Sequence, residues 1–214
     1  MTKQTKSFLH KCKLLLLGIT LLAILYVVGT FNPNFYVVQK IIAEEHNKAV
    51  KEMNSLGLFE PSFEYTDTTT FIAAVYKCID YVNYTTELNK RIPSGLIVAM
   101  AVVESGNGTS RFAVKGNNLF GIRTWDPKVK QMKPLDLPNA RFGVKVYKTK
   151  CDSIKDTVRI LNNHPAYAEF RKERDRQYKE KITDWETLVP LVAPWSTNEK
   201  YGAIILETII KREL

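Results

Sequence analysis

The sequence predicts a mostly helical α+β protein, in which a helical domain carries a small β-hairpin lobe and follows an N-terminal apolar helix. Residues 92–103 are apolar at nearly every position, which is typical of a central, buried helix. Residues 119–150 are rich in proline and end in strand-like alternation, which favours a hairpin lobe. Residues 67–89 repeat apolar side chains at helical spacing.

Composition limits the architecture and the partners. A chain of 214 residues with 45% hydrophobic content is long enough for one domain with a core and an appendage, but too short for two large domains. The net charge of +9 suits a polyanionic partner such as phospholipid headgroups, cell-wall polymer or nucleic acid. Residues 171–176 alternate in sign, which indicates a solvated helix face, and no nucleic-acid module is recognisable. We therefore expect no nucleic-acid partner.

The N-terminal residues have the pattern of an export signal. Four lysines precede the apolar run 14–28: Lys3, Lys6, Lys11 and Lys13. The length of the run fits either a membrane-spanning helix or the core of a signal peptide. Because no Ala-x-Ala cleavage site follows, we favour an uncleaved transmembrane anchor over residues 1–31, with its basic tip in the cytoplasm.

The elements that follow can be assigned in order. Residues 38–56 have a charged helical pattern, and with the linker 58–66 they make 32–66 a stalk. The helix over 67–89 has Asp67 or a nearby Thr as its N-cap. Beyond the lobe, three more helices are predicted: Asp152–His164, Thr183 or Asp184 to Ala193, and Asn198–Arg212.

The central helix places a carboxyl group at its end. Pro93 suits a first helical position and Gly106 suits a C-terminal stop, so Glu104 falls in the last turn. Burial and the negative end of the helix dipole both raise the pKa of a carboxyl there, which is the environment of a general acid. The alternative is an ordinary solvated glutamate, the commoner state of this residue type.

Cysteine and histidine usage adds little. Cys78 and Cys151 form a disulfide or remain two buried free thiols, and Cys12 lies at the membrane boundary. The three histidines are scattered: His10, His46 and His164. They have no metal-ligand spacing, so we expect no metal and no cofactor.

The segment from Glu104 to Arg123 carries a resemblance to a known family. The string Glu104-Ser-Gly-x-Gly-x-Ser-x-x-Ala, followed by Asn118-Leu-Phe-Gly-Ile-Arg123, resembles the bacterial glucosaminidases of glycoside hydrolase family 73, especially their Bax-like branch, in the lysozyme superfamily. The similarity covers roughly residues 67–214 and continues through the following positions: Arg141-Phe142, Tyr147, Cys151-Asp-Ser-Ile and His164-Pro-Ala-Tyr167.

This resemblance implies a lysozyme-like fold with a glycan cleft between the helices and the β-lobe. It implies a peptidoglycan hydrolase that cuts β-1,4 glycosidic bonds of the glycan strand, as an endo-β-N-acetylglucosaminidase. The alternatives are a muramidase of the same fold or a catalytically inactive cell-wall-binding or scaffold protein. We expect the protein in a bacterial inner membrane with its catalytic domain in the periplasm or outside, or secreted if the signal is cleaved.

The resemblance also assigns catalytic roles. Glu104 is the expected general acid. Tyr201 matches the family's cleft tyrosine, and a tyrosine of the core is the alternative. The family often supplies a second carboxylate from the lobe, yet no Glu lies between Glu104 and Glu169. Of the two lobe aspartates we favour Asp136, because Asp126 precedes a proline and suits a turn. A substrate 2-acetamido group can also replace a protein nucleophile.

Further residues are predicted to bind the glycan: Ser105, Asn118, Phe120, Trp125 and Tyr147. Aromatic rings can stack on sugar faces, although core packing is their commoner use. Among the aromatic side chains we favour Trp125 for stacking, because it follows Arg123 at the entrance of the lobe. The family often has an aromatic residue where this chain has Asn107.

Overall fold

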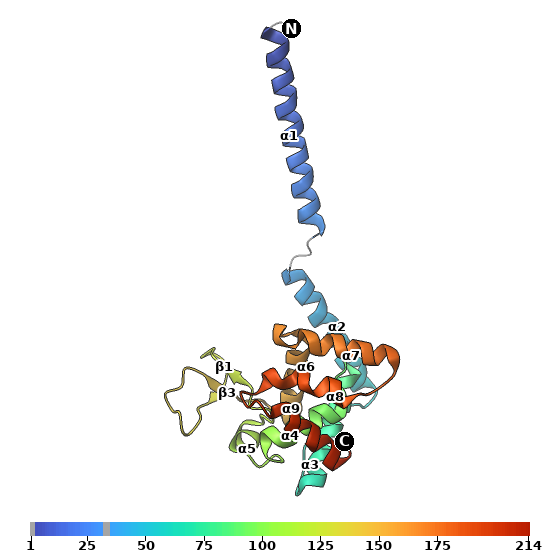
Figure 1. The fold of residues 1–214 in the computed structure, drawn as a ribbon, viewed down its shortest axis with the longest axis vertical. Coiled ribbons are helices and arrows are strands. Elements are labelled where there is room, and N and C mark those ends of the chain that lie inside the picture. Colours follow the sequence, from blue (N-terminus) through green and yellow to red (C-terminus); the bar gives the residue numbers. More distant parts are fainter. Residues whose placement is uncertain (1–2, 32–34) are drawn as a thin grey trace. The chain divides into compact units, whose positions relative to one another are not determined.

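The computed structural model describes residues 3–31 and 35–214, so the ends of the predicted anchor and the start of the predicted stalk lie partly outside the described residues. The chain divides into two compact units, Met1–Glu52 and Met53–Leu214 (Figure 1). Helix α1 (Lys3–Phe31) contains the predicted apolar run, and α2 (Phe35–Ser55) contains the predicted charged helical pattern. The transmembrane prediction is not supported: within the described ranges, no helix is both long and apolar enough to cross a membrane.

The second unit is helical with one small sheet. Its α-helices in chain order are α3 (Thr68–Tyr84), α4 (Ser94–Ser105), α5 (Arg111–Gly116), α6 (Lys150–Asn163), α7 (Ala168–Glu180), α8 (Trp185–Leu188) and α9 (Tyr201–Arg212). Its 3-10 helices are η1 (Leu88–Lys90), η2 (Pro165–Tyr167) and η3 (Val189–Trp195). A mostly helical α+β fold is therefore confirmed for this unit.

The predicted hairpin lobe is a three-stranded antiparallel sheet. Strands β1 (Arg123–Thr124), β2 (Gln131–Met132) and β3 (Gly143–Lys145) are arranged in the order β1-β3-β2. Arg123 pairs with Val144, and Gln131 pairs with Lys145. Figure 1 shows these strands and their loops extending from one side of the helices of this unit. The last strand in the sequence, β3, is thus the central strand of the sheet.

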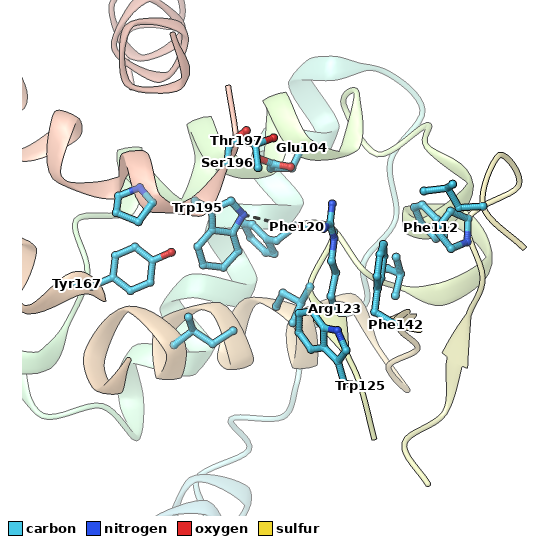
Figure 2. Close-up of a pocket in the computed structure, with 17 residues that line it drawn as sticks. Glu104, Phe112, Phe120, Arg123, Trp125, Phe142, Tyr167, Trp195, Ser196 and Thr197 are labelled. Carbon is cyan, nitrogen blue, oxygen red and sulfur yellow. Dashed lines mark hydrogen bonds between the residues drawn. The ribbon is translucent and has the colours of Figure 1, made fainter. Parts of the chain in front are cut away.

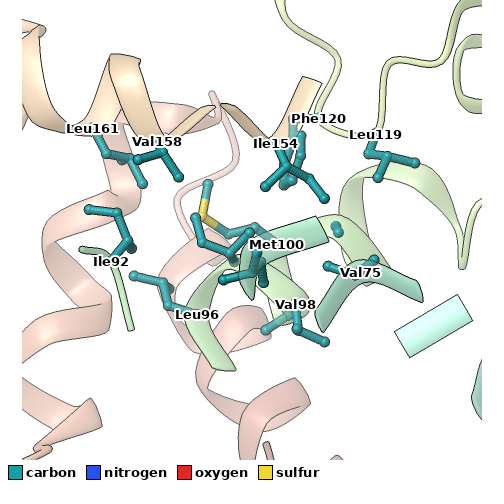
Figure 3. Packing of buried hydrophobic residues seen from close by; sticks show 14 of the residues in the cluster. Val75, Ile92, Leu96, Val98, Met100, Leu119, Phe120, Ile154, Val158 and Leu161 are labelled. Carbon is teal, nitrogen blue, oxygen red and sulfur yellow. The ribbon is translucent and has the colours of Figure 1, made fainter. Parts of the chain in front are cut away.

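Helix α4 forms the centre of the core. It packs against α3 and α9, and every residue from Gly95 to Val102 is buried. Leu96 and Met100 of this helix lie among side chains from the surrounding elements (Figure 3). The prediction of a central helix over 92–103 is confirmed, with Pro93 as its N-cap rather than its first residue. Gly106 ends it in the left-handed conformation, with φ +58°.

Several boundaries differ from the prediction for local reasons. The short helix α5 was not predicted; Ser110 caps it by accepting a hydrogen bond from the Ala113 N–H at 3.2 Å. Helix α7 contains the charge-alternating run 171–176, which confirms a helix face there. The helix predicted from Asp184 onward is divided into α8 and η3, because prolines within η3 cannot donate the hydrogen bonds of a regular helix.

Helices α3 and α6 are linked covalently. The structure contains the Cys78–Cys151 disulfide, which decides between the two states that the sequence left open. The Cα atoms of these cysteines are 5.1 Å apart, and 73 positions separate them in the sequence. Closing a loop of that length restricts the unfolded chain and contributes about 4 kcal/mol to stability. Asp67 caps α3 as predicted, through a reciprocal capping box with Thr70.

Part of the predicted linker belongs to the core. Phe63 and Tyr65 contact Phe71 of α3, with ring centroids 5.9 Å and 5.2 Å away. The Tyr65 hydroxyl also donates a hydrogen bond to the Gly108 carbonyl at 2.7 Å. The segment before α3 therefore supports the loop that follows α4.

Gly108 should be irreplaceable in this arrangement. Its φ is +81°, and an added Cβ would lie 2.7 Å from the Phe71 ring and 2.8 Å from the Tyr65 ring. Gly121 is a matched control, because its φ is +65° but a Cβ there meets only Glu104 Oε2, at 3.9 Å. We expect Gly121→Ala to cost about 1–2 kcal/mol for the left-handed backbone, and Gly108→Ala to cost about 1–3 kcal/mol more for the clash. Equal losses in denaturant titrations would contradict this packing.

Candidate active site

A cavity of roughly 640 Å³ lies between the helical part and the strand lobe. Most of its lining comes from the end of α4, the segment 120–125, the loops around β2 and β3, and the segment 194–197. Phe112, Ile160 and Tyr167 complete it. Figure 2 shows that aromatic side chains dominate the walls, with Glu104 at one edge. A cavity of this size and composition is suited to part of a polymer chain.

Glu104 is placed by the end of the buried helix. It is half-buried, one residue before the last residue of α4, and it lines the cavity. Gly121 faces Glu104 from the opposite segment. A Cβ atom added at Gly121 would lie 3.9 Å from Glu104 Oε2, which is ordinary van der Waals contact. Access to the carboxyl group is therefore open on the cavity side and narrow on the side of the 118–123 turn.

Burial raises the pKa of the Glu104 carboxyl, and the neighbouring Tyr201 hydroxyl and the charge of Arg123 only partly oppose this effect. The predicted elevation of the pKa is thus present in the folded chain. Burial, followed by the charge of Glu104, also raises the pKa of Tyr201. The Tyr201 hydroxyl is buried and interacts with the adjacent Glu104 carboxyl. Tyr201 is therefore adjacent to Glu104, but it belongs to the buried core and does not line the cavity, unlike the cleft tyrosine that the resemblance implied.

The turn after Glu104 is held by hydrogen bonds between the Ser105 side chain and backbone groups. The Ser105 hydroxyl donates to the Ala101 carbonyl at 2.6 Å and accepts from the Gly108 N–H at 2.7 Å. Ser105 is fully buried and does not line the cavity. The structure therefore gives Ser105 a role in shaping the turn, rather than the glycan contact that was predicted. Asn107 continues the turn at φ +58°, a conformation that asparagine tolerates better than an aromatic residue.

Asn118 organises the opposite wall. Its side-chain carbonyl accepts from the N–H groups of Phe120 and Ile122, at 3.2 Å and 3.1 Å. Its amide donates to the carbonyls of Ile122 and Lys145, at 3.1 Å and 3.0 Å. Asn118 is buried outside the cavity lining, so its polar atoms fix the turn and do not face a ligand.

The aromatic walls form two groups. Phe120 and Trp195 meet edge to face at 6.3 Å, and the Trp195 indole N–H donates to the Phe120 carbonyl at 3.3 Å. On the lobe, Trp125 lies 6.0 Å from Phe142 and remains 67% exposed. An exposed indole on the rim of a cavity is available to stack on a sugar ring.

The predicted residues separate into two classes. Glu104, Phe120 and Trp125 line the cavity together, as predicted. Tyr147 does not: its hydroxyl donates to the Asp156 carboxylate at 2.7 Å, and its ring packs on the core. Asn118 and Ser105 hold backbone segments, as described above. Among the described residues, no three His, Cys, Asp or Glu side chains gather into a group that could hold a metal ion.

Neither aspartate of the lobe lines the cavity. Asp136 is exposed in the loop between β2 and β3, although Pro134 and Leu137 on either side of it are lining residues. Asp126 accepts a hydrogen bond from the Lys128 N–H at 2.9 Å, which is the turn chemistry that Asp126-Pro127 predicted. Glu104 is therefore the only carboxylate among the described residues that line the cavity.

Sequence reasoning missed several lining residues. The sequence assigns no role to Arg123 beyond its position close to Trp125 and in the family resemblance. In the structure Arg123 lines the cavity, and its charge acts to lower the pKa of Glu104. Phe142 and Trp195 line the walls, as do Ser196 and Thr197. The sequence signal for Phe142 was its presence in the family resemblance. For Ser196 and Thr197 we find no signal, because they reach the cavity only through the folding of the C-terminal segment onto α4.

These features define a class of protein: a helical domain with a small β-lobe, whose aromatic cleft presents one carboxyl group with a raised pKa. The chain belongs to the glucosaminidase family, described as mannosyl-glycoprotein endo-beta-N-acetylglucosaminidase, which it matches over residues 82–214. It is therefore a glycosidase-family protein. This match includes Glu104 and every residue that lines the cavity.

Two known proteins are similar to the chain. It is 37% identical to protein bax of Escherichia coli (strain K12) over 83 residues, which are 39% of this chain and 28% of that protein. The matched part thus spans about a quarter of the curated relative. The crystal structure of the catalytic domain of the autolysin Auto from Listeria monocytogenes aligns with a TM-score of 0.52 at 16% identity. That alignment covers 85% of this chain and 97% of the autolysin domain, and it shows a shared fold.

The raised pKa of Glu104 makes a prediction about stability. Below the ordinary pKa of glutamate, the Glu104 carboxyl is mostly neutral in both the folded and the unfolded wild-type protein. Glu104→Gln should therefore unfold at nearly the wild-type temperature at pH 4. As the pH rises through the higher folded-state pKa, the wild-type protein ionises a partly buried carboxyl and loses stability that the amide variant keeps. Thermal unfolding from pH 4 to pH 8 should show a growing advantage for Glu104→Gln.

Glu207→Gln is the control, because Glu207 is exposed on α9. It should track the wild-type protein across the same range. A Glu104→Gln variant whose advantage shrinks with rising pH would show that the carboxyl prefers its ionised form in the fold.

Proposed function

We propose that this chain is a peptidoglycan hydrolase that cleaves β-1,4 bonds of the glycan strand on the reducing side of N-acetylglucosamine, with Glu104 as general acid. The position of Glu104 carries the proposal: it is the one carboxyl in the lining of the described cavity, and burial favours its protonated form. Membership of the glucosaminidase family and the fold shared with an autolysin catalytic domain support it.

Cleavage needs a proton and a stabilised cation. The protonated Glu104 would donate its proton to the glycosidic oxygen as the bond from C1 to that oxygen breaks, leaving an oxocarbenium-like sugar. Water then adds to C1, and the proton that the water loses returns to the Glu104 carboxylate. Aromatic walls from Phe120, Trp195 and Trp125 would hold the sugars on either side of the bond.

The cavity favours assistance from the substrate at the cationic stage. A second protein carboxylate is absent from the described lining, and Asp136 points from an exposed loop beside it. The 2-acetamido group of an N-acetylglucosamine can supply the missing nucleophile from within the sugar. Such assistance requires an N-acetylated sugar on the non-reducing side of the cut, which agrees with the proposed bond specificity.

The proposal predicts that Glu104→Gln loses activity on purified peptidoglycan by at least about a hundredfold, because general acid catalysis is worth about a hundredfold to ten-thousandfold. The amide keeps the shape of the side chain, so sedimentation with insoluble peptidoglycan should be retained. Mass spectrometry of the wild-type products should show N-acetylglucosamine at the new reducing end. N-acetylmuramic acid there would identify a muramidase, and a wild-type protein that binds but yields no products would be a wall-binding protein.

Substrate assistance predicts a mild effect at the lobe. Asp136→Asn and its matched control Asp126→Asn should both retain turnover within about threefold of the wild-type rate, measured by release of reducing ends under the same conditions. Both changes remove one charge from the lobe, so a general electrostatic effect would appear in both. A selective loss of a hundredfold or more in Asp136→Asn would return Asp136 to the catalytic role that the sequence predicted.

A further inference from the structure

Arg123 is one of two charged side chains in the described lining of the cavity, and Glu104 is the other. In Figure 2 the Arg123 side chain extends between the Phe120–Trp195 group and the lobe aromatics Phe142 and Trp125. While Glu104 is protonated, Arg123 therefore supplies the only formal charge on the described walls of the cavity.

The guanidinium group of Arg123 is positioned but not neutralised. The backbone of Arg123 pairs with Val144 of β3. The guanidinium carbon of Arg123 lies 4.5 Å from the centre of the Phe142 ring. Among the described residues it has no hydrogen-bond acceptor and no ion-pair partner. Stacking on an aromatic face orients the planar group and leaves its edge of N–H donors free.

Two other arginines of the same unit, Arg91 and Arg174, differ from Arg123. Arg91 donates to the carbonyls of Thr86 and Asn83, at 3.2 Å and 2.8 Å, so it completes the end of α3. Buried Arg174 donates to Asp175 and Asn162. Those guanidinium groups satisfy the fold, whereas the donors of Arg123 face a cavity.

The free edge of a guanidinium group suits carboxylate and phosphate groups, and the glycan strand of the proposed substrate carries carboxylates. Two parallel N–H donors fit the two oxygens of a carboxylate, and the charge strengthens both hydrogen bonds. Peptidoglycan strands carry such groups: the 3-O-lactyl group of every second sugar ends in a carboxyl, which is either free or joined to a peptide with carboxylates of its own. Chitin oligosaccharides have the same β-1,4 linkage and 2-acetamido groups but no carboxylate.

We infer that Arg123 binds a carboxylate carried by the sugar or the attached peptide next to the bond that is cut, and so selects peptidoglycan over uncharged glycans. The inference rests on the proposed function, because it identifies the part of that substrate that enters the cavity beside Glu104. Arg123 is thereby a specificity-determining residue, in a position that the sequence treated only as a neighbour of Trp125.

The test compares three substrates in parallel: chitohexaose, glycan strands stripped of their peptides, and intact peptidoglycan. Arg123→Ala should lower kcat/KM on the carboxylate-bearing substrates by about tenfold to a hundredfold more than on chitohexaose, the range expected for charge-assisted hydrogen bonds. Any effect of the lost charge on Glu104 is common to all three substrates and cancels in the ratio. Arg123→Lys, which keeps the charge but not the paired donors, should fall between.

Lys128→Ala is the matched control, because Lys128 is an exposed cation of the same lobe outside the lining of the cavity. It should leave the ratio between substrates unchanged. A selective loss on stripped strands identifies the lactyl carboxylate as the ligand, and a selective loss on intact peptidoglycan identifies a peptide carboxylate. An equal loss on chitohexaose and on both charged substrates overturns the inference.

Binding separates this inference from the proposed activity. Calorimetric titration of Glu104→Gln with chitohexaose and with stripped strands measures affinity without turnover. Adding Arg123→Ala to that variant should weaken binding of the stripped strands, or of soluble peptide-bearing fragments, and spare chitohexaose. That result would stand even if the wild-type protein cleaved nothing. Cleavage that depends on Glu104, with no change in the ratio on loss of Arg123, would sink this inference alone.

Discussion

The burial of α4 on every side is the constraint on which the rest of the structure depends. A helix that is apolar all round has one stable position, between α3 and α9, and it cannot slide without exposing core side chains. Gly106 ends it at a fixed point, so the carboxyl of Glu104 emerges at the boundary between core and cavity. The same burial that places the carboxyl also raises its pKa, because a charge there loses its hydration. Position and protonation therefore have a single physical cause.

The motif that marks the site contains more scaffolding than contact residues. Ser105 and Asn118 use their polar atoms on backbone groups, because a buried polar atom without a partner costs more than a hydrogen bond gains. The outcome is two rigid turns that face each other, with Glu104 on one and Phe120 and Arg123 on the other. The linker residue Tyr65 completes this arrangement by bonding to Gly108 from outside the motif. A preformed cleft reduces the entropy lost when a ligand binds.

The two ends of the cavity have different electrostatic environments. At the α4 end, burial favours the neutral form of the Glu104 carboxyl, and the adjacent Tyr201 hydroxyl only partly opposes this effect. At the lobe end, Phe142 supports a guanidinium group that cannot lose its charge. Aromatic side chains line the cavity between these two groups. This asymmetry gives a direction to the cleft, because a polymer with charge on alternate units meets different groups at the two ends.

The sequence by itself determined the elements that depend on local chemistry. A continuous apolar run predicted α4, Asp67 or a nearby Thr predicted the start of α3, and a glutamate at the end of the apolar run marked a carboxyl group that lines the described cavity. Only the tertiary structure decided which residues meet across the cavity. Trp195 bonds to the Phe120 carbonyl across 75 positions, and the Cys78–Cys151 bridge spans 73. The place of β3 between β1 and β2 and the hydrogen bond from Asn118 to the Lys145 carbonyl also depend on distant contacts. Ser105 and Tyr147, in contrast, bond to partners within nine positions in the sequence. Local propensity fixes where a helix starts and stops, whereas a cleft is made by segments whose approach no local pattern records.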